Sequence, residues 1–158
     1  MRTFLTSLLL LLSIGEVSAA DLGPGSRLML AAIVAEHSPL LGEFEKRTIA
    51  RLAAGNLPSA AHKNKVIAVA ADDLECRVSN VDITSRFCDI RFGRQTVTLK
   101  GRGAHELFAT IAEMGVAPTG AAGSFFIGVS RLNCALNPNE LRQKAGSGAE
   151  CSFGPATE

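Results

Sequence analysis

Residues 74–115 read LECRVSNVDITSRFCDIRFGRQTVTLKGRGAHELFATIAEMG, and this stretch decides the fold. With a first turn near Asp82 and a type II′ turn at Gly93-Arg94, three segments alternate apolar and polar residues as strands do. The two turns, placed independently, put the same side chains on one face: Leu74, Cys76, Val78, Cys88, Ile90, Phe92, Val97 and Leu99. Because a slip of one residue would invert a whole strand, this agreement predicts an antiparallel three-stranded meander.

A helix is predicted directly after the meander, beyond Gly101-Arg102-Gly103. Its apolar residues recur at spacings of three and four, which is typical of one helical stripe: Ala104, Leu107, Phe108, Ile111 and Met114. Gly115 suits a left-handed cap, and Pro118 prevents continuation of the helix. We expect the stripe to pack on the apolar face of the meander.

The first residues have the pattern of a secretory signal peptide over 1–19. Arg2 supplies a positive start, residues 8–14 are apolar, and Val17-Ser18-Ala19 is a small-residue cleavage site. Residues 20–158 are expected to form one domain, helical over 24–55 and with a sheet–helix core over 65–153. We therefore expect a periplasmic or secreted protein with no membrane span after cleavage.

Four cysteines lie beyond the predicted cleavage site, and four cysteines permit three pairings. The strand register selects Cys76–Cys88, which leaves Cys134–Cys151. The cysteine spacings lack the close pairs of a zinc site, so we expect neither a metal nor another cofactor. A net charge of +1 gives no electrostatic footprint for nucleic acid.

The segments before the meander predict two helices and a strand. Residues 26–36 are apolar almost all round, and Ser38 with Pro39 reads as the N-cap and first turn of a helix that runs to about Ala54. The stripe of this second helix would be Leu41, Phe44, Thr48 and Leu52. Residues 65–71 alternate as a strand, and Asp72-Asp73 predicts a bulge or tight turn.

Residues 124–136 fit two patterns. A helix with Ser124 as its N-cap would place Phe125, Val129, Leu132 and Leu136 on one side, whereas alternation at 125, 127 and 129 fits a strand. We favour the helix. Asn137-Pro138 then begins another helix, and residues 151–153 return to Cys134. The expected fold is α+β, with a three- to five-stranded antiparallel sheet, helices on one face, two N-terminal helices and two disulfides.

The start of the central helix is one candidate site. Arg102 and the free backbone N–H groups could bind an anion there, and His105 could act as an acid or base. His105 and Glu106 are adjacent in a helix and point about 100° apart, which argues against a working dyad. Every cysteine is assigned to a disulfide, so the sequence indicates no nucleophile and no catalytic residue.

A second candidate is the glycine-rich segment with Gly120, Gly123 and Ser124, which could cradle a phosphate. It lacks the GxxxxGK[ST] pattern and a nearby lysine, so we favour a tight turn.

Three segments resemble a group of small exported bacterial proteins of unassigned function. They are LECRVSNVDI (74–83), GRGAHELFAT (101–110) and GVAPTGAAG (115–123), within a likeness that covers about residues 65–153. The resemblance implies export and disulfide bonding, and it carries over no catalytic residue.

Three functions fit these observations. The first is a non-catalytic binding or inhibitory module of the cell envelope, with the polar sheet face around Arg77, Asp89, Arg91 and Lys100 as its contact surface for an envelope or extracellular protein. The second is a small enzyme or anion-binding protein that uses Arg102 and His105. The third is a structural envelope component.

Overall fold

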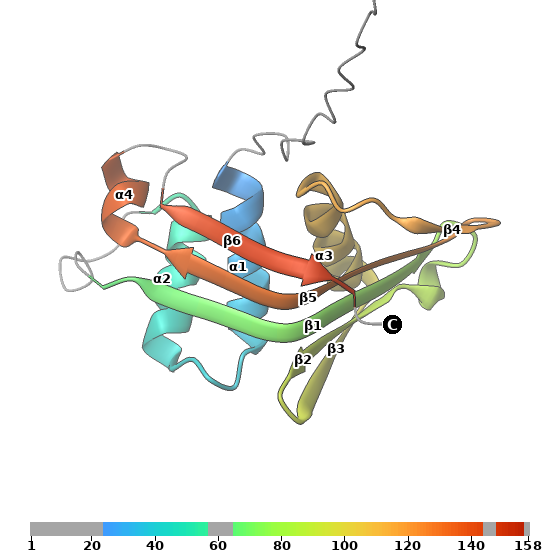
Figure 1. Ribbon diagram of the computed structural model, residues 1–158, viewed down its shortest axis with the longest axis horizontal. Coiled ribbons are helices and arrows are strands. Elements are labelled where there is room, and N and C mark those ends of the chain that lie inside the picture. Colours follow the sequence, from blue (N-terminus) through green and yellow to red (C-terminus); the bar gives the residue numbers. More distant parts are fainter. Residues whose placement is uncertain (1–23, 57–64, 144–147, 157–158) are drawn as a thin grey trace, which may run out of the picture.

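The computed structural model describes residues 24–56, 65–143 and 148–156, which form an α+β fold (Figure 1). The predicted signal peptide lies outside the described residues. The elements in chain order are α1 (Pro24–His37), α2 (Glu43–Ala53), β1 (Ile67–Ser79), the 3₁₀ turn η2 (Ile83–Ser85), β2 (Phe87–Phe92), β3 (Gln95–Lys100), α3 (Gly101–Glu113), β4 (Thr119–Ala121), β5 (Ser124–Leu136), α4 (Pro138–Gln143) and β6 (Ala149–Pro155).

The predicted three-stranded meander is confirmed, and its strands pair in the predicted register. Cys76 pairs with Cys88 between β1 and β2, and Ile90 pairs with Val97 between β2 and β3. Gly93 has a φ of +60°, as the predicted turn requires. The eight side chains predicted to share one face point toward the helices, where six are buried and Val97 and Leu99 are partly buried.

The sheet has six antiparallel strands in the order β3-β2-β1-β5-β4, with β6 also paired to β5. The expected count of three to five strands was too low because residues 119–121, 124–136 and 149–155 are all strands. In Figure 1, α1, α2 and α3 lie on the same side of the sheet, and α4 lies beyond the end of β5. Among the described helices, none has the length and apolar character needed to cross a bilayer.

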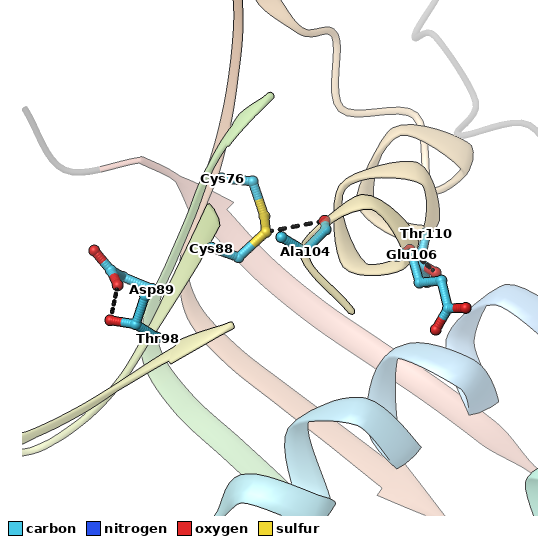
Figure 2. The surroundings of a disulfide bond; sticks show 7 residues. All are labelled: Cys76, Cys88, Asp89, Thr98, Ala104, Glu106 and Thr110. Atoms are coloured by element: carbon cyan, nitrogen blue, oxygen red, sulfur yellow. Dashed lines mark hydrogen bonds between the residues drawn. A yellow bond between two sulfur atoms is a disulfide. The ribbon is translucent and has the colours of Figure 1, made fainter. Parts of the chain in front are cut away.

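Both predicted disulfides are present, and they pair all four cysteines. The sulfur of Cys88 lies 3.2 Å from the carbonyl oxygen of Ala104 in α3 (Figure 2). The sulfur of Cys151 lies 3.7 Å from the carbonyl oxygen of Arg27 in α1. A disulfide sulfur carries no hydrogen, so these are packing contacts. Each disulfide therefore lies directly beneath one helix of the covering layer.

The two longest strands, β1 and β5, change their inward face at the same point. In β1, Ala71 and Leu74 are both buried although they are three residues apart, and Val129 and Leu132 repeat this in β5. Arg131 has a φ of +52°, which is uncommon for a residue with a side chain. The alternation breaks at residues 72–73 as predicted, but the predicted bulge or tight turn is wrong: β1 is continuous, and Ala71 and Asp73 keep one register with Leu132 and Ser130.

The helix predicted at residues 124–136 is wrong, because this segment is the strand β5. Ser124 begins that strand and caps no helix. At Arg131 the inward-facing positions change from odd-numbered to even-numbered residues. The buried Val129, Leu132 and Leu136 therefore fall at the spacings of three and four that are typical of a helical stripe.

The predicted start of the second helix is also wrong. The Ser38 hydroxyl accepts the Leu40 N–H at 3.2 Å in a local turn, and α2 begins at Glu43 after Gly42. Its buried residues are Thr48, Ile49 and Leu52, whereas Phe44 is 52% exposed. The predicted end is confirmed, since α2 stops at Ala53 and is followed by Gly55, with a φ of +76°.

The start of α4 follows the sequence prediction. The Asn137 side-chain oxygen accepts the Asn139 N–H at 3.1 Å, and its amide nitrogen donates to Glu140 at 2.8 Å. Pro138 occupies the first helical position, as the capping pattern predicts.

Candidate functional site

The first predicted site lies on the exposed outer surface of α3. Arg102 has a side chain that is 91% exposed, and its Nε donates to Glu106 at 2.8 Å, one helical turn away. His105 is also exposed, between these two residues in the chain. The guanidinium group is thus engaged in a local ion pair on the surface, and anion binding here stays a prediction.

The second predicted site is the hairpin that joins β4 to β5. Its two turn residues, Ala122 and Gly123, both have positive φ, at +56° and +81°. A Cβ atom on Gly120 would lie 2.1 Å from the carbonyl oxygen of Ser124. The Gly123 carbonyl accepts the Asn80 N–H at 2.8 Å and ties the hairpin to the end of β1. The glycines thus allow a tight turn, and phosphate binding there stays a prediction.

Gly120, Gly123 and Ser124 are brought together in one hairpin, whereas Arg102 and His105 belong to α3. The two groups belong to different elements, so we treat them as separate candidates. Among the described residues, no group of three or more His, Cys, Asp or Glu side chains could hold a metal ion.

The polar face of the sheet, which we define by Arg77, Asp89, Arg91 and Lys100, is the third candidate. Its side chains point away from α1 and α3 because they alternate with the buried residues of β1, β2 and β3. Arg77 and Arg91 are exposed, and so is Lys100. This surface therefore presents charged groups from three neighbouring strands.

Several of these side chains have a partner that limits their motion. Arg91 forms an ion pair with Asp73 of β1. The Thr98 hydroxyl of β3 donates to the Asp89 carboxylate, as Figure 2 shows. The guanidinium carbon of Arg77 lies 5.9 Å from the centre of the Phe126 ring, within the range of a cation–π contact.

Two acidic residues are direct cross-strand partners on this face. Glu75 of β1 pairs with Asp89 of β2, and both side chains are half-buried. Like charges directly opposite in an antiparallel pair destabilise it. The polar face thus carries a local cost to stability beside its favourable pairs.

Asp82 organises the connection between β1 and β2, at the end of the polar face. Its carboxylate accepts hydrogen bonds from the Ser85 hydroxyl at 2.6 Å and from the Thr84 hydroxyl and N–H at 2.6 and 2.9 Å. These bonds, first the one from Ser85, lower the pKa of Asp82 below its ordinary value of 3.8. The carboxylate is therefore charged at neutral pH and acts as the cap of η2.

Sequence reasoning missed Phe126 as a member of this surface, because it favoured a helix over residues 124–136. The available signal was the alternation of Ile127 and Val129, which places Phe126 on the opposite side of a strand.

Comparison with protein-family models, with curated proteins and with solved structures finds no match for this chain.

Proposed function

We propose that the chain without its predicted signal peptide (residues 20–158, called the processed chain below) is a non-catalytic binding or inhibitory module of the cell envelope, and that the polar face of its sheet is the contact surface. The observation that carries this proposal is the one-sided cover of the sheet. The helices α1 and α3 pack on one face, with α2 on the same side against α1 (Figure 1), while Arg77, Arg91 and Lys100 on the other face remain exposed.

The internal pairs of the polar face support this proposal. Arg91 is held by Asp73, and Arg77 lies over the Phe126 ring. A surface whose long side chains are already held loses less conformational entropy when it binds a partner. Both arginines are nevertheless exposed, so each keeps donors that a partner could meet.

The opposed carboxylates of Glu75 and Asp89 give further support. A chain under selection for stability alone would gain from a neutral residue at either position. Proteins commonly give up stability where function requires a particular surface. We therefore assign these two carboxylates to the contact surface, opposite a donor group of the partner.

The proposed compartment is supported by the two disulfides and by the predicted signal peptide. Two disulfides indicate an oxidising compartment outside the cytoplasm. Together with the predicted signal peptide, they favour the periplasm or the outside of the cell as the place of binding. The expected partner is accordingly an envelope or extracellular protein.

The proposal is tested by capture of envelope proteins on the purified processed chain. The variant carries Arg77→Glu and Lys100→Glu, which reverse two exposed charges on the polar face. The control carries Arg47→Glu and Arg51→Glu, which make the same change in net charge on exposed positions of α2. Thermal melts confirm that both variants fold.

We expect one stoichiometric partner that the control retains and the polar-face variant loses. A partner that binds both variants equally would place the contact surface elsewhere. Repeated capture of no stoichiometric partner would count against a binding module.

A further inference from the structure

The strand β1 is paired along its whole length on one side and along only part of its length on the other. β5 pairs with β1 from Ile67 to Ser79, with a break at the irregularity, whereas β2 pairs only between Asp73 and Arg77. Figure 1 shows the β2–β3 hairpin beside one half of β1. In the described part of the chain, no strand lies on this side of residues 67–71.

The ladder between β5 and β6 shows which backbone groups of β5 turn toward β1. The Asn137 N–H donates to the Gly148 carbonyl at 2.7 Å and continues the pairing of β5 with β6. Because backbone groups alternate in direction along a strand, Asn133 and Ala135 also turn toward β6. Cys134 and Leu136 therefore turn their N–H and C=O groups toward β1.

The same alternation identifies the groups of β1 that no strand of the described chain pairs. Val69 is the partner of Cys134, and Ile67 is the partner of Leu136, so both use their backbone groups in the β5 ladder. Ala68 and Ala70 then direct their N–H and C=O groups away from β5, toward the side with no strand. This edge offers two donors and two acceptors in the spacing of a strand.

In the described part of the chain, this edge lacks two of the features that usually protect one. Residues 66–71 read VIAVAA, with no charge and no proline. Natural edges are commonly protected by charged residues, prolines, bulges or a covering segment, because an unprotected edge recruits other strands. Val66 is 54% exposed at the start of the edge. An exposed apolar edge of this kind is suited to pairing with another polypeptide.

A hollow of about 300 Å³ lies at the far end of the same edge. Its lining includes Leu40, Ala70, Ala71, Phe92 and Leu132. Leu40 is 78% exposed, so most of its apolar side chain is open to a ligand. An apolar side chain placed in this hollow would cover Leu40.

The hollow also has a fixed wall, because the Asp72 carboxylate accepts the Gly93 N–H and holds the tip of the β2–β3 hairpin.

The five residues of the edge, from Ile67 to Ala71, have a combined length of about 17 Å, at ~3.4 Å per residue. It therefore has room for a strand of about five residues.

From these observations we propose that an extended peptide segment of a partner protein binds this edge by adding a strand antiparallel to β1. Its backbone pairs with Ala68 and Ala70, and alternate apolar side chains lie on the helix side, one of them in the hollow beside Leu40. The ligand class is thus an extended peptide that is apolar at every second position. The site is distinct from the polar face, so either proposal can fail alone.

The test uses a synthetic peptide, acetyl-KVKVKVK-amide, titrated into the ¹⁵N-labelled processed chain. In the free protein the Ala68 and Ala70 amides should exchange with solvent at least ~100-fold faster than Val69, which is bonded to β5. Saturating peptide should slow both by at least ~10-fold. The same peptide N-methylated on its lysines should have no effect, because those N–H groups face the edge, and N-methylation on the valines should leave binding intact.

Two variants separate the edge from general peptide affinity. Ala70→Pro removes an edge donor that β5 does not use and should weaken binding by at least ~10-fold. Thr98→Pro, which removes an outward N–H from the other edge at β3, should leave binding unchanged. Leu40→Lys alters an exposed side chain in the hollow, leaves the backbone intact and should weaken binding by at least ~5-fold.

Three results would overturn the proposal. Slow exchange of Ala68 and Ala70 in the dilute free protein would show that the chain covers its own edge. Protection that grows with protein concentration in the absence of peptide would show that a second copy is the occupant. Peptide binding that is equal in the wild type and in Leu40→Lys would remove the hollow from the site, even if Ala70→Pro failed to fold.

Discussion

Removal of the Cys76–Cys88 disulfide should destabilise the protein more than removal of Cys134–Cys151. The perturbation is a pair of double variants, Cys76→Ala/Cys88→Ala and Cys134→Ala/Cys151→Ala. Each leaves the other disulfide in place, so the two costs in free energy of unfolding can be compared directly.

The two disulfides close loops of similar length, with sequence separations of 12 and 17 residues. In the chain-entropy model each contributes ~3 kcal/mol, and the longer loop gains only ~0.3 kcal/mol over the shorter one. The packing of the sulfur atoms has the opposite effect, because it makes removal of Cys76–Cys88 the more costly change. Cys76 and Cys88 are both fully buried beneath α3, with Cys88 against Ala104, whereas Cys151 is only partly buried. The lost packing should add ~1 kcal/mol to the first variant.

The assay is urea unfolding at pH 7, followed by circular dichroism, with the free energy taken from midpoints and slopes. We expect losses of ~4 kcal/mol for the first variant and ~3 kcal/mol for the second. A larger loss in Cys134→Ala/Cys151→Ala, or a loss below ~1 kcal/mol in either double variant, would contradict this prediction.

Three further predictions concern single residues. Leu107→Ala should cost ~2–5 kcal/mol in urea unfolding, because Leu107 is fully buried in α3; a cost below ~1 kcal/mol would contradict the packing described. Gly120→Ala should lower stability by ~1–3 kcal/mol, because its Cβ would meet the Ser124 carbonyl, whereas Gly25→Ala, with open space around it, should not; equal melting temperatures would contradict this. The lowered pKa of Asp82 means that its capping bonds stabilise the fold above pH 3.8 and are lost as pH falls through the folded pKa; an NMR titration of the carboxyl carbon with a midpoint at or above 3.8 would contradict it.

The meander and its Cys76–Cys88 disulfide could be predicted from the sequence because two independent turns agreed on one buried face; Cys134–Cys151 then followed as the remaining pair. In this region each strand alternates regularly, and Cys76 pairs with Cys88 as that alternation requires. The helix α3 could also be predicted, because its stripe repeats over three turns before Gly115, whose φ is +89°. Local pattern and tertiary contact coincide there.

The strand β5 was not predicted because a backbone feature changes its pattern. Arg131, at a φ of +52°, shifts the inward face by one residue, and no residue type announces such a shift. Leu132 and Leu136 then fall at helical spacing from Val129 although all three lie in a strand. A local pattern cannot separate a helix from a strand that changes face.

The candidate surfaces were predicted in part for the same reason. Arg77, Asp89, Arg91 and Lys100 could be placed on one face because they belong to regular strands. Phe126, which lies under the Arg77 guanidinium, could not, because it belongs to β5. The unpaired edge at residues 67–71 depends on where β2 ends relative to β1, which only the tertiary register reveals.

The claim on which the proposed function depends is that one face of the sheet is covered and the other is open to solvent. A soluble gadolinium chelate tests it through its effect on methyl relaxation in the processed chain. The methyl groups of Thr96 and Thr98, on the open face, should relax strongly, and those of Ile90 and Val129, beneath the helices, should be shielded. Threonine methyls shielded as well as that of Ile90 would contradict the account, because the polar face would then be covered.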